Sequence, residues 1–227
     1  MKCPNCGKEG ARFKDKKKLL ANKGKSQRFR EFGRDSNLAK CNKLNLGCGG
    51  VKKKGYINVD YNDIFEPDFN IDLDKFPYPF RGNYFDVVEA MYILEHLYNP
   101  FKVMKEIHRI SKKGAEVIIK VSHFSRGFTH AEHKRSFDVG FPLYFNKNFK
   151  EGYLGYEFEL IEMKLVWFSQ PCLKKKVLSK TVYFISNIVG KLLDFLANVN
   201  PYFCSRVWCF LVGGFEEISF RFKVRKK

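Results

Sequence analysis

The chain has 227 residues, of which 44% are hydrophobic and 16% aromatic. This length and composition exclude a wholly disordered chain and suffice for one α/β domain with additions. The net charge of +18, from 42 basic and 24 acidic residues, favours anionic partners such as nucleic acid or anionic lipid surfaces.

The first 40 residues are basic and hold few large apolar side chains. Residues 1–43 contain fourteen Lys or Arg against four Asp or Glu. We expect residues 1–40 to form a weakly ordered arm, either a tether to phosphates or a solvated tail. No apolar core follows the basic start, as a secretory leader requires, so the sequence predicts a cytoplasmic protein.

Two cysteines in this arm have the spacing of half a zinc site. Cys3 and Cys6 flank Pro4-Asn5, and a glycine follows them. A structural zinc needs four ligands, of which Cys41 could supply a third and a histidine or a partner subunit the fourth. The alternative is that this segment has the cysteine spacing of a zinc knuckle but binds no metal.

The main domain is expected at 41–227 and opens with a strand at 42–46 that ends in closely spaced glycines. Gly47 and Gly49 let the backbone pass close to a ligand. A second strand at 56–60 ends in Asp60, whose carboxylate can accept hydrogen bonds from ribose hydroxyls. A dinucleotide site would need glycine at Lys52 and an acid about 20 residues on, so the spacing favours another cofactor.

Together with Asp60, the run Asn45-Leu46-Gly47-Cys48-Gly49 resembles the class I S-adenosylmethionine-dependent methyltransferases. The resemblance continues through a short strand at 69–71 followed by Asp72-Leu73, and through a strand at 84–89 leading into Leu94-Glu95-His96. It implies S-adenosylmethionine as cofactor, with Asp60 at the ribose, Asp72 and Leu73 at the adenine, and Met91 and Tyr92 beside the methionine part. The implied cofactor-binding residues are Asn45, Gly47, Cys48, Gly49, Asp60, Tyr61, Asp72, Leu73, Met91 and Tyr92.

Helical spacing of apolar residues predicts a helix over Tyr98–Ser111, and three further strands follow it. We expect these strands at 115–121, 156–168 and 215–224, the last with alternating phenylalanines. Alternating strands and helices predict an α/β, doubly wound, mostly parallel sheet. The resemblance implies a seven-stranded Rossmann-like methyltransferase fold whose last strand is antiparallel.

A helical insertion at 171–214 precedes that last strand and has an apolar stripe flanked by lysines. Lys191 and Asp194 are expected to interrupt any span long enough to cross a bilayer. We favour a helix that covers the substrate side of the pocket or packs on the sheet. The other interpretation is peripheral contact with a membrane, as a lipid-linked substrate would require.

Methyl transfer needs an aligned acceptor and, for a hydroxyl, a base. The candidates lie in the histidine-rich loop after the fifth strand, where His123 or His133 could be the base and Arg135 an anion anchor. One alternative is a metal held by His123, His130, His133 and Glu132, although the neighbouring cations would repel a metal. The other is that the histidines only form hydrogen bonds that structure the loop.

The loop resembles that of a methyltransferase subgroup associated with cell-surface or lipid-linked glycan synthesis. The leading hypothesis is therefore methylation of a hydroxyl or amine of a small-molecule acceptor, such as a glycan or lipid-linked one. An RNA methyltransferase using the basic arm is the second hypothesis, although Glu89-Ala90-Met91-Tyr92 lacks the Pro-Pro motif usual in amino-methylating relatives. A cofactor-binding module without catalysis is the third.

Overall fold

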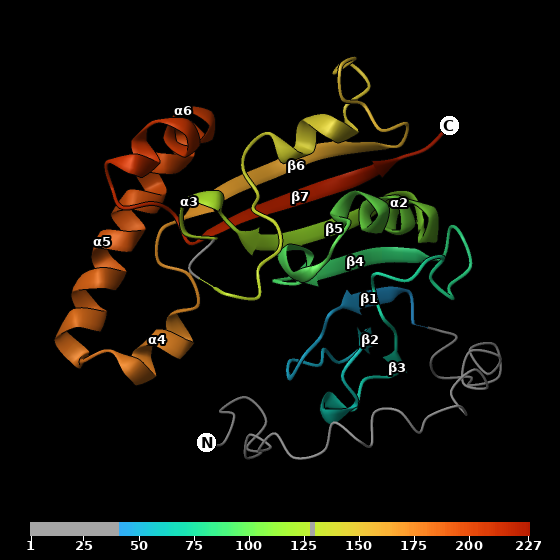
Figure 1. The fold of residues 1–227 in the computed structure, drawn as a ribbon, viewed down its shortest axis with the longest axis horizontal. Coiled ribbons are helices and arrows are strands. Elements are labelled where there is room, and N and C mark those ends of the chain that lie inside the picture. The colour runs from blue at the N-terminus through green and yellow to red at the C-terminus, as the bar shows by residue number, and fades with distance from the viewer. Residues whose placement is uncertain (1–40, 128–129) are drawn as a thin grey trace.

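One seven-stranded sheet organises the part of the chain that the structure, a computed structural model, describes: residues 41–127 and 130–227. The strand order is β3-β2-β1-β4-β5-β7-β6, and β7 runs antiparallel to both neighbours while the other pairs are parallel. The strands are β1 (Lys43–Leu46), β2 (Ile57–Asp60), β3 (Phe69–Asn70), β4 (Phe85–Met91), β5 (Ser111–Ser122), β6 (Glu157–Val166) and β7 (Glu217–Arg225). The predicted fold class is confirmed (Figure 1).

Strands that are buried on both faces have apolar residues at nearly every position, and strands that are buried on one face have them at alternate positions. In β1 and β2 nearly every side chain is buried, as expected for central parallel strands. In β7 the buried side chains Phe220, Phe222 and Val224 alternate with exposed ones, which confirms the predicted alternation.

Helix α2 (Pro100–Ile110) connects β4 to β5 and buries the apolar face that its spacing predicts. Its start is set by Asn99, whose side chain accepts a hydrogen bond from the Lys102 backbone at 3.0 Å, and by proline in the first turn. The chain becomes extended again at Ser111, so β5 begins earlier than expected.

Two charged residues of α2 also lie inward, which the helical pattern does not predict. Glu106 accepts a hydrogen bond from the Tyr78 backbone at 2.8 Å and pairs with Arg109 at 2.8 Å. Arg109 in turn donates to the carbonyls of Tyr78 and Phe80 at 2.8 and 2.9 Å. The pair thereby satisfies backbone groups of the loop before β4.

Short helices occupy several connections: η3 (Asp63–Phe65), η4 (Leu94–His96), α3 (Phe124–Gly127), η5 (Phe141–Phe145) and η6 (Trp208–Phe210). The crossings from β1 to β2 and from β2 to β3 contain no α-helix, although alternating strands and helices were expected. The aromatic residues of η5 pack against those of β6 and β7, where Phe145 lies 5.4 Å from Phe158 and 6.0 Å from Phe222 between ring centroids.

The insertion between β6 and β7 forms α4 (Pro171–Val177), α5 (Lys180–Val199) and α6 (Pro201–Arg206). Figure 1 shows these helices together at one end of the molecule, beyond the ends of β6 and β7. By length and composition alone α5 is a candidate membrane span, in spite of Lys191 and Asp194. Only 11% of its apolar window is buried, so the helix does not pack its apolar stripe on the sheet.

Candidate active site

The glycine loop after β1 is held against the end of β2. The Gly49 backbone N–H donates to the Asp60 carboxylate at 2.8 Å, and the Cys48 backbone N–H donates to the Val59 carbonyl at 2.9 Å. Gly47 and Gly49 both have positive φ, +66° and +48°, which glycine adopts without steric cost. The loop and Asp60 thus form one unit, as their spacing predicts.

Gly47 also lies against the loop that follows β4. A Cβ added at Gly47 would lie 2.5 Å from Cγ1 of Ile93, so a larger residue cannot be accommodated there without displacement. Around Gly49, by contrast, a Cβ would meet no atom within 4 Å, which leaves open space beside the loop. The ends of β1 and β4 therefore meet at one position.

Asp60 and Asp72 present carboxylates at this edge of the sheet. Asp60 is 6% exposed, and its other oxygen accepts from the Asn62 backbone at 2.9 Å. The Asp72 side chain is half-exposed and pairs with Lys75 at 3.3 Å, while Leu73 beside it is buried. Tyr61 is exposed.

The end of β4 supplies the remaining residues that the resemblance implies. Met91 is half-buried, and Tyr92 has φ of +54°, which is uncommon for a residue with a side chain. The Tyr92 hydroxyl contacts the Glu217 carboxylate, and burial followed by that charge raises the pKa of Tyr92 above its usual range. Strained backbone of this kind gathers at functional sites.

These residues fit the part that the resemblance assigns to them. The order β3-β2-β1-β4 brings four neighbouring strand ends to one edge, where open α/β sheets bind ligands. Asp60 can accept from ribose hydroxyls and Asp72 from an adenine amino group, with Gly49 leaving room for the backbone to approach. Asn45 is buried, and its side-chain amide donates to the Val51 carbonyl at 3.1 Å and to the Asn58 side-chain oxygen at 3.0 Å. These hydrogen bonds connect the glycine loop to β1 and β2. Cys48 remains a neutral thiol at neutral pH, because burial and then Asp60 raise its pKa to about 11.

A cavity of about 370 Å³ begins beside these residues, at Tyr92. We call it the acceptor cavity. It is lined by Tyr92, Glu95, His96, Ser122, Arg126, His130, His133, Ser169, Gln170, Leu173, Lys174 and Glu216. Leu173 and Lys174 come from α4, so the insertion does contribute one wall, as the covering-helix interpretation expects.

Glu95 is a buried carboxylic acid in the wall of the acceptor cavity. Its Oε1 accepts from the backbone and hydroxyl of Ser122 at 3.1 and 3.2 Å, whereas Oε2 has no hydrogen-bond partner in the described part of the chain. Burial raises the pKa of Glu95 to about 7. A carboxyl group of that pKa, with one unpaired oxygen, is suited to accept a proton near neutral pH.

Three histidine rings gather in the same wall. His130 stacks on His133 with ring centroids 4.7 Å apart, and His96 meets His133 edge-on at 4.8 Å. The Nδ1 atom of His133 lies 2.5 Å from the Gly127 carbonyl, which can only accept, so Nδ1 holds the hydrogen. Nε2 of the neutral His133 ring is therefore an acceptor.

His123 lies apart from this cluster, inside the protein. It has no exposed surface, and its two ring nitrogens bond the hydroxyls of Ser125 and Ser205 at 2.7 and 2.9 Å. Burial lowers its pKa to about 4. His123 therefore joins the end of β5 to α6, and its burial argues against the expected part as a base.

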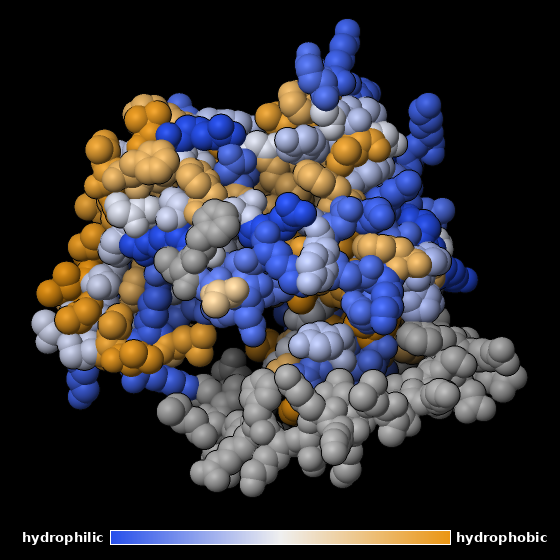
Figure 2. Space-filling model, viewed as in Figure 1, coloured by the Kyte–Doolittle hydropathy of each residue, from blue (hydrophilic) through white to orange (hydrophobic). Residues whose placement is uncertain are grey.

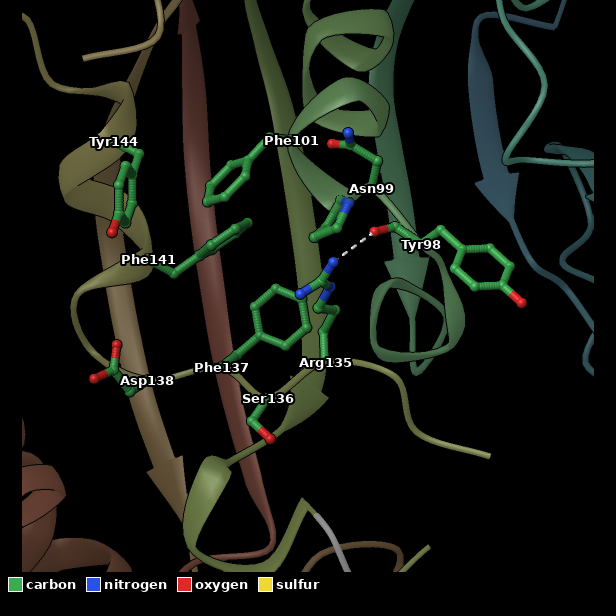
Figure 3. Close-up of a pocket in the computed structure, with 10 residues that line it drawn as sticks. Tyr98, Asn99, Phe101, Arg135, Ser136, Phe137, Asp138, Phe141 and Tyr144 are labelled. Carbon is green, nitrogen blue, oxygen red and sulfur yellow. Dashed lines mark hydrogen bonds between the residues drawn. The ribbon is translucent and has the colours of Figure 1, made fainter. Parts of the chain in front are cut away.

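Arg135 lies in a different cavity, of about 380 Å³. Figure 3 shows it among Phe101, Phe137 and Phe141, donating to the Tyr98 carbonyl at 3.2 Å. The Arg135 backbone N–H donates to the Glu95 carbonyl at 3.2 Å, but its side chain does not line the acceptor cavity, so the expected anion anchor does not reach that cavity. The cations of the acceptor cavity are Arg126 and Lys174, both paired with Glu216.

Nothing in residues 41–127 and 130–227 groups three or more His, Cys, Asp or Glu side chains in a way that could hold a metal. The stacked histidines do not converge on a point, so the alternative of a histidine-bound metal is not supported. Cys3 and Cys6 lie outside the described residues, and a zinc ion there is unsupported.

The sequence interpretation missed Glu95 and Glu216 as residues of the site. Glu95 stands in the run Leu94-Glu95-His96, and an acid beside a histidine just after a buried strand was a usable signal. No local signal identifies Glu216, which reaches the cavity only because β7 starts at this edge of the sheet.

Comparison with known proteins supplies one match within the chain: residues 66–119 match the family described as "Methyltransferase domain". This segment runs from before β3 into β5 and so includes Asp72, Tyr92 and Glu95. No curated protein matches the chain significantly.

Several solved structures are similar over most of the chain. A SAM-dependent methyltransferase from Archaeoglobus fulgidus is 16% identical, with 88% of this chain and 94% of that one covered and a TM-score of 0.46. One from Mesorhizobium loti is 11% identical over 80% and 90% of the two chains, with a TM-score of 0.48. The [4+2]-cyclase SpnF is 15% identical over 82% and 74%, with a TM-score of 0.46. All three TM-scores lie below 0.5.

Proposed function

We propose that this S-adenosylmethionine-dependent methyltransferase methylates a hydroxyl or amine of a small molecule held in the acceptor cavity, with glycan and lipid-linked acceptors the leading class. The main support is Glu95, a buried carboxylic acid with one unpaired oxygen that belongs to the wall of the acceptor cavity, which begins at Tyr92, one of the expected cofactor-binding residues. A cytoplasmic location, with contact to a membrane surface, belongs to the same proposal.

S-adenosylmethionine supplies a methyl group on a sulfonium, which leaves the acceptor with a proton to lose. Glu95 can take that proton, since burial raises its pKa to about 7. His133 is a second acceptor, because Gly127 fixes its hydrogen on Nδ1 and leaves Nε2 free to accept. Arg126 and Lys174, which also line the cavity, both pair with Glu216, so the cavity is polar without a large excess of either charge.

Binding of the cofactor is tested by calorimetry with S-adenosylmethionine on the wild-type protein, with NAD as a negative control. Asp60→Ala should weaken binding by about tenfold or more, because hydrogen bonds to a charged group contribute about 1.5–3 kcal/mol. Glu151→Ala, at an exposed residue outside the site, is the matched control and should bind normally. A folded wild-type protein that binds no S-adenosylmethionine would overturn the proposal.

The acceptor class is tested with S-adenosylmethionine labelled in its methyl group, offered with lipid extract, soluble glycans or RNA. We expect label in the lipid or glycan fraction, and much less of it with Glu95→Gln. Label in RNA alone would overturn the acceptor proposal in favour of the RNA hypothesis. Cofactor binding without label in any fraction would favour the module without catalysis.

A further inference from the structure

The insertion presents a continuous apolar surface to solvent. Figure 2 shows hydrophobic residues gathered along the edge of the molecule where α4, α5 and α6 lie in Figure 1. The exposed large apolar residues of α5 are Val182, Phe184, Ile185, Ile188, Val189, Leu192, Phe195, Leu196 and Val199. Phe184, Phe195 and Val199 are 63%, 70% and 74% exposed. Patches of this kind mark contact surfaces.

The inner face of α5 is small and polar, which reverses the arrangement of an ordinary surface helix. Its two buried residues are Gly190 and Ala197. Asp194 accepts from the Trp167 backbone at 2.6 Å, and Asn198 both accepts from and donates to the Leu165 backbone at 2.9 Å. A helix of a water-soluble surface turns its apolar stripe inward and its polar residues outward.

These contacts also determine how the helix can lie relative to a bilayer. Asp194 and Asn198 join α5 to the end of β6 and the residues just after it, so the helix stays attached to the sheet along its second half. A helix attached in this way cannot cross a bilayer while the sheet remains in water. Its apolar outer face can, however, enter the interface while its axis stays parallel to the membrane plane.

Lysines border the apolar surface. Lys175 and Lys176 lie in the last turn of α4, Lys180 begins α5, and Lys191 lies on α5, all of them exposed. Lysines close to an anionic leaflet are attracted to its surface charge. The combination of an apolar face and bordering lysines is the pattern of interfacial helices, and the net charge of +18 has the same sign.

We propose that the outer face of α5 and α6 docks into the interface of an anionic lipid membrane, with the sheet held on the aqueous side. The docking proposal stands on the exposed face alone. Its extension to the substrate rests on the proposed function: Leu173 and Lys174 line the acceptor cavity and belong to the same insertion. A lipid-linked acceptor could therefore reach the cavity from the membrane along α4.

The test is co-sedimentation of the full chain with vesicles of phosphatidylcholine, with and without phosphatidylglycerol. Salt of about 0.1 M and about 1 M separates charge attraction from apolar insertion, because the higher salt screens charges beyond about 3 Å. We expect binding to the anionic vesicles that persists in part at the higher salt. The double substitution Phe184→Glu with Phe195→Glu should reduce vesicle binding about tenfold or more, because two large aromatic rings are then no longer transferred from water into the membrane.

The matched control replaces two apolar residues that are exposed elsewhere, Leu154→Glu with Ile161→Glu, which are 40% and 50% exposed in the wild type. This control should bind vesicles as the wild type does. Lys175→Glu with Lys176→Glu should lower binding to anionic vesicles more than to neutral ones.

Three outcomes would overturn the proposal. They are absence of binding, binding that both phenylalanine substitutions leave unchanged, and a dimer in ultracentrifugation that those substitutions dissociate. Calorimetry with S-adenosylmethionine on the same variants separates this result from the proposed function. A variant that binds cofactor normally but not vesicles is folded, and its loss then concerns the membrane surface alone.

Discussion

Replacing Glu95 with glutamine should make the protein more stable at neutral and alkaline pH. In the wild type, burial raises the pKa of Glu95 from 4.5 to about 7. The folded protein therefore keeps a proton that the unfolded chain releases, and the free energy of unfolding falls as pH rises from 4.5 to about 7. At about 1.4 kcal/mol for each pH unit, the loss approaches about 3 kcal/mol.

Glutamine does not titrate, and its carbonyl can still accept from Ser122. The difference in unfolding free energy between Glu95→Gln and wild type should thus grow by about 3 kcal/mol between pH 4.5 and 8. His123, whose pKa is lowered to about 4, gives the opposite slope between pH 4 and 6.5, but it is present in both proteins and cancels.

The assay is urea unfolding followed by circular dichroism at several pH values, on wild type, Glu95→Gln and the exposed control Glu151→Gln. The control should differ from wild type by a constant amount at every pH. A Glu95→Gln difference that is equally constant would refute the reasoning, because Glu95 would then titrate in its ordinary range.

Gly47→Ala should destabilise the protein and abolish binding of S-adenosylmethionine in calorimetry, because its Cβ would lie 2.5 Å from Ile93 at a φ of +66°; unchanged binding would mean that the loop is not part of the site. His123→Ala should cost about 2–4 kcal/mol in urea unfolding and leave cofactor affinity unchanged, since the ring packs inside the protein. Asn198→Ala should expose α5 to limited proteolysis and cost about 1–3 kcal/mol, because it leaves both backbone groups of Leu165 without their partner; equal cleavage of variant and wild type would contradict the attachment.

The sheet, and the proximity of the glycine loop to Asp60, could be predicted from the sequence because their signals are local. Buried strands appear as apolar runs, and Gly47, Gly49 and Asp60 stand directly at strand ends, so chain order alone brings them together. The start of α2 has similar local causes in Asn99 and Pro100.

Residues whose roles depend on distant partners could not be placed in the same way. Glu106 and Arg109 have the sequence spacing of a solvated helix face, yet both satisfy backbone groups of a loop that precedes β4. The sequence around His123 and His133 does not show which of the two rings is buried. His123 is buried, and the hydroxyl that its Nε2 contacts belongs to Ser205, more than eighty residues later.

Helix α5 shows why periodicity gives the stripe but not its direction. Its apolar residues recur with helical spacing, and that pattern alone assigns them to the interior. The polar groups of Asp194 and Asn198 reverse the assignment, because β6 is an outer strand of the sheet whose end offers backbone groups that apolar residues cannot satisfy. The hydrogen bonds that Asp194 and Asn198 form with the backbone near the end of β6 therefore decide that the apolar stripe of α5 faces outward.

The topology of the sheet also explains why the insertion and the acceptor cavity coincide. Because β7 is antiparallel, it starts at the edge where β4, β5 and β6 end, so the link from β6 to β7 lies at that edge. The residues expected to bind the cofactor occupy the other half, on β1 to β4, and share only Tyr92 with the cavity. On the proposed function, changes in the link can therefore alter which acceptor is reached, and from which surface, without disturbing the glycine loop after β1.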